Sequence, residues 1–259
     1  MSNNNVAIVT GGSSGLGNAV VNLLMGNGYQ VSSLDLKASK ADLSIICDVS
    51  HAIEVEQAVT KTISTFGKIN ALVCCAGISL NKFQPTHLTE IDEWDRCINV
   101  NLRGSFLASK YTLPHLIDSK GAVVFIGSVS GVFPQPGSAS YSSSKAGVIA
   151  LSRSIALEYG PLFVRSNCIS PGYMKTEMTL GLRTNSKLNE KITEQIPLGR
   201  MSDTSEIASA VLFLLTDGAS FITGVNITAD GGNSLTSFAD LNDVRKMWRS
   251  KTQSSKNTQ

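Results

Sequence analysis

The chain has 259 residues, a hydrophobic content of 42% and a formal net charge of +2. This length fits one large domain or two small ones, and the hydrophobic content is high enough for a buried core, which excludes a disordered chain. So small a net charge does not indicate a nucleic-acid partner. No apolar run approaches the roughly 20 residues of a membrane helix, and the N-terminus lacks the features of a signal peptide.

The five cysteines are odd in number and show no CxxC motif and no Cys/His spacing typical of a metal site. Reduced, buried thiols are the simplest interpretation. We therefore expect a soluble, cytoplasmic, single-domain protein without a metal site.

Short apolar runs alternate with helical stretches along almost the whole chain. The predicted strands are residues 6–10, 30–36, 44–48, 71–75, 122–126, 164–169 and 225–228. Between them, helices are predicted at residues 15–28, 53–66, after Thr89, and at 140–159 and 202–215. These strands are continuous apolar runs and do not alternate apolar with polar residues. Such strands, separated by helices, indicate a parallel sheet covered on both faces. The sequence therefore predicts a doubly wound α/β fold with a mostly parallel sheet of seven strands.

Two segments stand outside this pattern. Residues 173–200 form a long polar connection interrupted by Gly181, Pro197 and Gly199, and connections of this length are often lids. Residues 234–259 form a polar C-terminal tail that we expect to fray. We therefore predict a single domain over residues 1–233.

A glycine-rich turn, TGGSSGLG, follows the first predicted strand. At that edge of a doubly wound sheet, glycines let a pyrophosphate reach backbone N–H groups at the start of a helix. The spacing is Thr10-Gly11-x-x-x-Gly15-x-Gly17, one residue longer between the first two glycines than GxGxxG. By itself the turn is equally compatible with an ordinary tight loop.

Asp35 stands eighteen residues after Gly17, at the end of the second predicted strand. A carboxylate there can accept hydrogen bonds from an adenosine ribose. The glycine turn and this carboxylate together favour a dinucleotide over a single phosphate.

Tyr141 and Lys145 are four residues apart on a predicted helix and therefore share one face. Tyrosine ordinarily has a pKa of about 10, too high for a base at neutral pH. An ammonium about 5 Å away favours a phenolate by roughly 3 kcal/mol at an effective dielectric constant of about 20. Ser128 lies thirteen residues before Tyr141, just past the fifth strand, where it can hydrogen-bond the same substrate oxygen. The alternative is an ordinary surface pair of tyrosine and lysine.

These motifs together resemble the short-chain dehydrogenase/reductase family, in its classical branch. The resemblance extends from Val6 to about Gly232 and includes TGxxxGxG, the serine after strand five and YxxxK. Further marks follow in the family's order: Asp48-Val49, Asn99-Val100-Asn101-Leu102, Ser170-Pro171-Gly172 and Asp230-Gly231-Gly232.

The resemblance implies a catalytic tetrad of Asn101, Ser128, Tyr141 and Lys145. Tyr141 would exchange the proton, Lys145 would bind the nicotinamide ribose, Ser128 would orient the substrate oxygen, and Asn101 would hold a water that links Lys145 to solvent. The implied cofactor contacts are Gly11, Ser13, Ser14, Gly15, Leu16, Gly17, Asp35, Leu36, Asp48, Val49, Cys75, Ala76, Gly77, Tyr141, Lys145, Pro171, Gly172, Met174 and Thr176.

One position departs from the family pattern. Cys75-Ala76-Gly77 stands where the family usually has Asn-Ala-Gly, and that asparagine ties neighbouring strands together. Because cysteine is a weak hydrogen-bond donor, this tie is in doubt. We interpret the change as a local loss of stability, with a redox-sensitive thiol as the alternative.

The sequence thus favours an oxidoreductase that transfers a hydride between NAD(H) and a secondary alcohol or ketone. The carboxylate of Asp35 would meet the 2′-phosphate of NADP as a like charge, although Lys37 is near enough to compensate. An NADPH-dependent reductase of 3-oxoacyl-type substrates and a non-catalytic NAD-binding sensor or scaffold are the alternatives.

The substrate itself is not readable from the sequence, but the expected pocket is largely apolar. Its expected walls are the segment after Gly77, residues 129–135 and the lid. The candidate lining residues, which would serve equally as core or interface residues, are Leu80, Val132, Phe133, Gln135, Tyr173, Met178 and Leu182. A homotetramer is expected from the resemblance and from the apolar residues on more than one face of helix 140–159.

Overall fold

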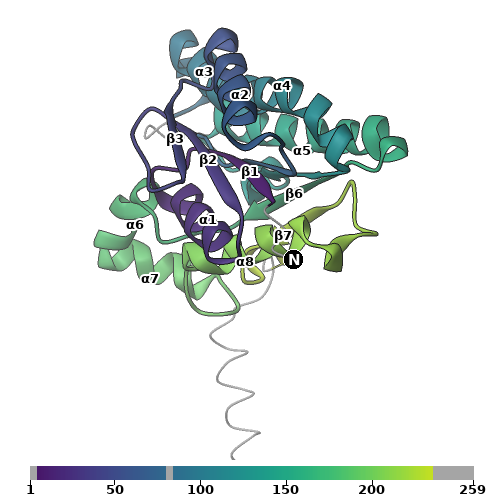
Figure 1. Cartoon of the computed structure of the whole chain (residues 1–259). Coiled ribbons are helices and arrows are strands. Elements are labelled where there is room, and N and C mark those ends of the chain that lie inside the picture. The colour runs from purple at the N-terminus through teal and green to yellow at the C-terminus, as the bar shows by residue number, and fades with distance from the viewer. Residues whose placement is uncertain (1–4, 80–83, 236–259) are drawn as a thin grey trace, which may run out of the picture.

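A seven-stranded parallel sheet runs through the centre of the molecule (Figure 1). The computed structural model describes residues 5–79 and 84–235. The strand order is β3-β2-β1-β4-β5-β6-β7, and every neighbouring pair is parallel. The strands are β1 (Val6–Thr10), β2 (Gln30–Asp35), β3 (Leu43–Ile46), β4 (Ala71–Cys74), β5 (Ala122–Ile126), β6 (Arg165–Pro171) and β7 (Asn226–Ala229).

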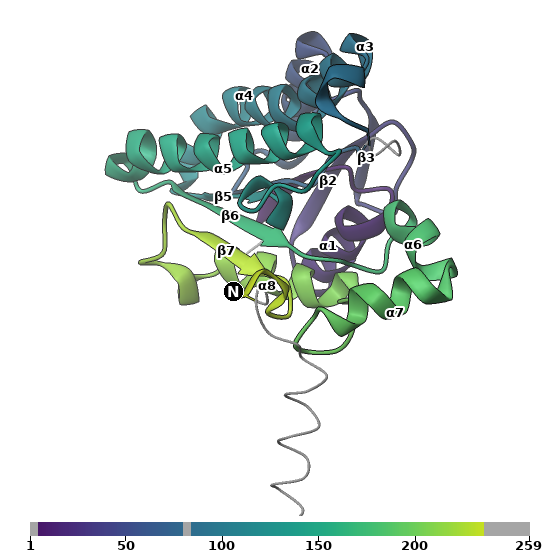
Figure 2. The same ribbon diagram turned by 180° about the vertical axis from the view of Figure 1, so that it is seen from behind.

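Helices cover both faces of the sheet. Helices α2, α4 and α5 lie over one face, whereas α1 and α8 lie over the other (Figures 1 and 2). Each face has its own apolar core, and all residues of the central strands β1, β4 and β5 are buried between the two. The helices are α1 (Gly15–Gly26), α2 (Ala52–Phe66), α3 (Ile91–Ile98), α4 (Gly104–Ser119), α5 (Ala139–Tyr159), α6 (Leu180–Thr184), α7 (Ser186–Glu194) and α8 (Thr204–Leu215).

This arrangement confirms the predicted doubly wound fold. Burial on both faces explains why the strands read as continuous apolar runs instead of alternating ones. The strand order reverses direction between β1 and β4, since β2 and β3 lie on one side of β1 and β4 to β7 lie on the other. In such a sheet ligands bind at this reversal, beyond the carboxyl ends of the strands.

The helix predicted after Thr89 is more complex than its pattern suggested. It begins at Ile91, after Glu90 as the N-terminal cap, and passes through a π-helical turn, η2 (Asn99–Arg103), before it continues as α4. A π-helical turn holds an extra residue and often marks a functional site. Apolar periodicity does not reveal such a turn, because one inserted residue barely changes the pattern.

The predicted lid, residues 173–200, has more structure than a polar loop. It contains the short 3-10 turn η5 (Glu177–Thr179) and helices α6 and α7. A small third core lies here, formed by Ile192 of α7, Ile196 just after it and Met201 just beyond the segment, with Tyr173 and Leu182 packed against them. Within the described residues no helix is both long enough and apolar enough to cross a membrane. Leu80 and nearly all of the predicted tail lie outside the described residues.

Candidate active site

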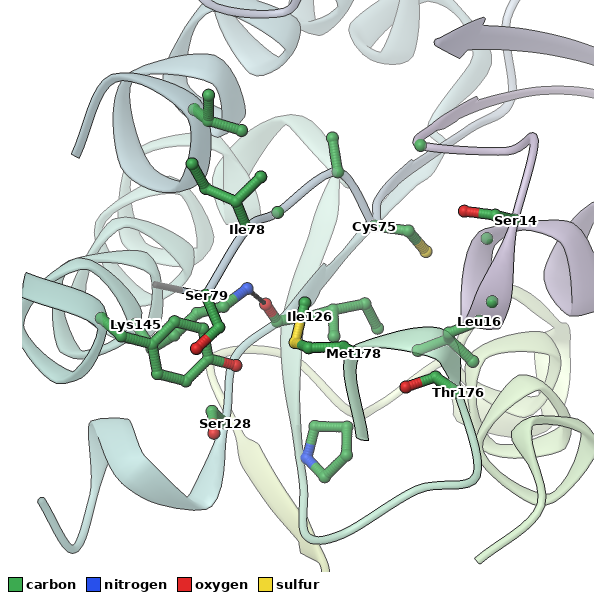
Figure 3. A pocket seen from close by; sticks show the side chains of 18 of the residues that line it. Ser14, Leu16, Cys75, Ile78, Ser79, Ile126, Ser128, Lys145, Thr176 and Met178 are labelled. Atoms are coloured by element: carbon green, nitrogen blue, oxygen red, sulfur yellow. Dashed lines mark hydrogen bonds between the residues drawn. The ribbon is translucent and has the colours of Figure 1, made fainter. Parts of the chain in front are cut away.

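A cavity of about 1170 Å³ opens at the carboxyl edge of the sheet (Figure 3). Its walls come from the segments that follow β1, β2, β4, β5 and β6, as the strand reversal predicts. It brings together nearly all the residues that the sequence singled out: Gly11, Ser14, Gly15, Leu16, Gly17, Asp35, Leu36, Asp48, Val49, Cys75, Ala76, Gly77, Ser128, Tyr141, Lys145, Pro171, Gly172, Met174 and Thr176.

The glycine turn lines one end of the cavity because its backbone is packed too closely for side chains. A Cβ on Gly17 would lie 2.0 Å from the carbonyl oxygen of Gly11, and one on Gly11 would lie 2.8 Å from the backbone of Ala76. Gly11 and Gly15 also have positive φ angles of 71° and 51°. The turn therefore requires glycine, and it exposes the N-terminus of α1 to the cavity, where a phosphate would find unpaired N–H groups.

Asp35 lines the same cavity and is held by two backbone donors. The N–H of Ser13 donates to Oδ2 at 2.9 Å, and the N–H of Lys37 donates to Oδ1 at 3.2 Å. Each oxygen keeps a further lone pair for a ribose hydroxyl. Ser13 itself does not line the cavity, and its N–H orients Asp35; its contact with the cofactor stays a prediction.

Lys145 is 5% exposed, and its ammonium donates to the carbonyl oxygen of Ile126 at 2.7 Å. Figure 3 shows this bond where the end of β5 meets the cavity. Among the described residues the ammonium has no carboxylate partner, so its two remaining N–H donors are left for a ligand. It lies 5.9 Å from the centre of the Tyr141 ring. The two residues are thus neighbours on one helix face, as their spacing predicts.

Ser128 reaches the cavity from a short turn, η3 (Val129–Gly131), directly after β5. Its Oγ accepts the N–H of Ser130 at 3.1 Å, which leaves its own hydroxyl hydrogen free to donate to a substrate oxygen. Gly131 lets this turn pack on α5, since a Cβ there would lie 2.8 Å from the backbone of Lys145.

Asn101 lies behind the cavity wall and is fully buried. Its Oδ1 accepts the N–H of Ile78 at 2.8 Å, and its Nδ2 donates to the carbonyl oxygen of Ile78 at 3.0 Å. Gly77 separates it from the lysine: a Cβ on Gly77 would lie 3.3 Å from Asn101 Oδ1 and 3.4 Å from Lys145 Nζ. Asn101 therefore fixes the loop that lines the cavity and does not line the cavity itself.

Cys75 lines the cavity, where the implied cofactor contacts gather, and Thr10 supplies a tie between strands nearby. The Oγ1 of Thr10, at the end of β1, accepts the N–H of Ala76 at 3.1 Å. Burial raises the pKa of the Cys75 thiol to about 12. The thiolate is therefore rare at neutral pH, which argues against the redox-sensitive alternative.

The lid closes over the glycine turn. The methyl carbon of Thr176 lies 3.8 Å from the position that a Cβ on Gly15 would take, and Met174 forms an isolated bridge with Ser202. Thr176 also caps η5 in a reciprocal capping box with Thr179. The lid thus reaches the expected phosphate end of the cavity.

The expected substrate pocket is partly correct. Gln135, Tyr173, Met178 and Leu182 line the cavity, and Gln135 Nε2 donates to the Tyr173 hydroxyl at 3.4 Å. Val132 and Phe133, which were also expected in this pocket, are not among the residues that line the cavity and are 40% and 52% exposed.

The sequence reasoning missed several lining residues on α3 and η2. They are Asp92, Asp95, Arg96, Asn99 and Val100, which lie on one helix face, three, four, seven and eight residues after Asp92. That spacing, together with Asn101 at the end of the same stretch, was the signal that could have found them. Ile78 and Ser79 were also missed, although they directly follow the expected Gly77.

Comparison with known proteins places this geometry in a family. The family model described as enoyl-(acyl carrier protein) reductase matches residues 11–234. The 2-(R)-hydroxypropyl-CoM dehydrogenase of Xanthobacter autotrophicus is 33% identical, over 87% of this chain and 97% of that protein. The meso-2,3-butanediol dehydrogenase of Serratia marcescens is 34% identical, over 88% and 94%.

A solved structure extends the likeness to three dimensions. The 3-ketoacyl-(acyl-carrier-protein) reductase of Brucella melitensis, crystallised with NADH, is 30% identical and superposes with a TM-score of 0.81, over 89% of this chain and 98% of that one. With the glycine turn, the YxxxK helix and the seven-stranded sheet in one arrangement, the chain belongs to the short-chain dehydrogenase/reductase family of nicotinamide-dependent oxidoreductases.

Proposed function

We propose that this protein is an NAD-dependent dehydrogenase that interconverts a secondary alcohol and its ketone. The observation that carries the proposal is the buried ammonium of Lys145, which lies beside Tyr141 in the same cavity as Asp35 and the glycine turn. Two relatives, the 2-(R)-hydroxypropyl-CoM dehydrogenase and the meso-2,3-butanediol dehydrogenase, support the interconversion of an alcohol and a ketone as the type of reaction.

The lining residues fit a dinucleotide. The glycine turn lets a phosphate come close to the backbone at the N-terminus of α1, and the carboxylate of Asp35 can accept hydrogen bonds from the adenosine ribose. Lys145 offers two N–H donors, which suit the hydroxyls of the nicotinamide ribose. When bound, the nicotinamide ring takes up or supplies the hydride, which no amino-acid side chain can do.

The residues around the reacting carbon handle the proton. In the oxidative direction Tyr141 takes the proton of the substrate hydroxyl, and in the reductive direction it returns one to the carbonyl oxygen. Lys145 stabilises the phenolate, because a positive charge nearby favours the negative form. The hydroxyl of Ser128 donates to the same oxygen and holds it toward Tyr141. In our proposal Asn101 completes the group through a water that links Lys145 to solvent.

Asp35 supports NAD as the cofactor. Its carboxylate faces the cavity where a ribose would lie, and a 2′-phosphate would meet a negative charge there. Lys37 is the basic residue nearby; its backbone N–H donates to Asp35, whereas its side-chain ammonium does not, and the Lys37→Ala variant below tests what that charge contributes.

A reductase of 3-oxoacyl-type substrates is the second candidate. It is supported by the likeness to the 3-ketoacyl-(acyl-carrier-protein) reductase of Brucella melitensis. A sensor without turnover is less well supported, since binding alone would not require a lysine buried next to a tyrosine. A cytoplasmic location remains part of the proposal, and the five free cysteines fit a reducing compartment.

Replacing Tyr141 by Phe should abolish turnover and leave NAD binding nearly intact, because only the proton-transferring hydroxyl is lost. The expected loss in kcat is about 100-fold or more. Reduced-cofactor absorbance with a panel of secondary alcohols, sugars, steroids and acyl thioesters measures turnover, and calorimetry measures NAD affinity. A variant that keeps more than about a tenth of the wild-type kcat contradicts the role of Tyr141.

The wild-type protein should use NAD with a higher kcat/KM than NADP, and Asp35→Ser should reverse or narrow that ratio. Removal of the carboxylate deletes the ribose acceptor and the repulsion of a 2′-phosphate in one step. Lys37→Ala serves as the matched control, since it removes a neighbouring charge and leaves the carboxylate. A wild-type ratio that favours NADP would overturn the assignment of the cofactor.

We also propose that the protein is a homotetramer. On α5, Val148, Ile149 and Ile155 are buried against the sheet, whereas Leu157 is 81% exposed and shares an outward face with Ala146 and Ala150. The exposed Arg153 lies on the same face, so the proposed contact with a second copy of the chain rests on Leu157 and the two alanines.

Light scattering at micromolar concentration should give a mass near four times 27.5 kDa. Leu157→Glu should lower the measured mass, because a charge at the centre of the contact cannot be desolvated cheaply. A monomer mass for the wild-type protein would end this part of the proposal.

A further inference from the structure

We propose that Ser144 is a positioning residue for the reaction: it ties Asn101 to the backbone of Tyr141. The inference rests on the proposed function. It concerns the middle of the segment Tyr141-Ser142-Ser143-Ser144-Lys145, where the sequence analysis assigned roles to the two ends alone.

The hydroxyl of Ser144 connects two elements at one point. It donates to the carbonyl oxygen of Tyr141 at 2.7 Å, in the first turns of α5. It accepts from Asn101 Nδ2 at 2.9 Å, across the boundary between α5 and the π-helical turn. Ser144 and Asn101 are both 0% exposed, so both bonds are shielded from bulk solvent.

The amide of Asn101 has no spare partner once Ser144 is removed. One of its two N–H groups donates to the carbonyl oxygen of Ile78, which leaves the other for Ser144. The only other acceptor within reach among the described residues is the sulfur of Cys97 at 3.4 Å, and sulfur is a weak acceptor. Without the serine hydroxyl, the buried amide loses a good partner and its orientation is less restricted.

A change at Asn101 reaches the reacting groups through the cavity wall. Asn101 clamps both backbone groups of Ile78, and Ile78 and Ser79 face the cavity near Lys145 in Figure 3. Gly77 lies between Asn101 and Lys145: a Cβ added to this glycine would be 3.3 Å from Asn101 Oδ1 and 3.4 Å from Lys145 Nζ. The chain of contacts therefore runs from the Tyr141 carbonyl through Ser144 and Asn101 to the loop against Lys145.

Ser144→Ala tests this role, with Ser152→Ala as the matched control. Ser152 is also 0% exposed and hydrogen-bonded on α5, but its partner is Ser166 on β6, away from the cavity. We expect Ser144→Ala to lower kcat by about 3- to 10-fold, the range that one lost hydrogen bond gives. The KM for NAD should change less than kcat, because neither Asp35 nor the glycine turn contacts Ser144. Both variants should lower the thermal midpoint similarly.

Equal kcat values for the two serine variants would overturn the proposal, since a general loss of stability would then explain both. Should the alanine variant not fold, Ser144→Cys keeps the size of the side chain and a weak hydrogen-bonding group, and we expect its kcat to fall below that of wild type. A wild-type kcat in that variant would equally overturn the proposal.

A double-mutant cycle separates action through Asn101 from an independent effect. Adding Ser144→Ala to Asn101→Ala should reduce kcat no further, whereas effects that multiply would contradict the proposed connection. Tyr141→Phe is measured alongside. If it retains turnover, the proposed function fails and this inference fails with it. If it abolishes turnover while Ser144→Ala matches the wild type, the inference alone fails.

Discussion

The buried ammonium of Lys145 is the group on which the site depends. A charge this deep is costly unless it is hydrogen-bonded, and the carbonyl oxygen of Ile126 at the end of β5 is its one acceptor among the described residues. Its two other donors have no protein partner among the described residues and point to a ligand in the cavity. In our proposal this one side chain both holds a ribose and provides the charge beside Tyr141.

The sheet places the ends of several strands around that ammonium, and glycines let the backbone of the neighbouring loops come close to it. The carboxyl ends of parallel strands meet at one edge, so β1, β4, β5 and β6 all contribute to the cavity. Gly77 and Gly131 both lie close to Lys145. A Cβ on Gly131 would be 2.8 Å from the lysine backbone, which leaves no room for a side chain, and a Cβ on Gly77 would be 3.4 Å from Nζ, which leaves very little. Thr176 of the lid lines the same cavity as the glycine turn, so the expected phosphate end and the expected reacting end belong to one continuous cavity.

The sequence was sufficient to predict the sheet, the glycine turn, Asp35 and the cluster of Ser128, Tyr141 and Lys145, because each depends on local spacing and on the rule that parallel strands end together. It was insufficient where the outcome depends on packing between distant elements. Nothing in the apolar pattern indicates that Asn101, within the π-helical turn, lies behind the cavity wall, or that Phe133 is exposed outside the cavity. The link from Asn101 to Ser144 joins residues 43 positions apart and became visible only in the folded chain.

The most direct test of the central claim is to replace Lys145 by Met, which keeps an apolar stem and removes the ammonium, and to measure NAD affinity and kcat on the same preparation. Because one charge is proposed to serve both functions, the dissociation constant for NAD should rise by about tenfold or more, and kcat should fall by at least as much. Circular dichroism and the thermal midpoint verify that the variant is folded. A variant that binds NAD as tightly as the wild type would contradict the proposed contact with the ribose, and a variant with normal kcat would contradict the role of Lys145 beside Tyr141.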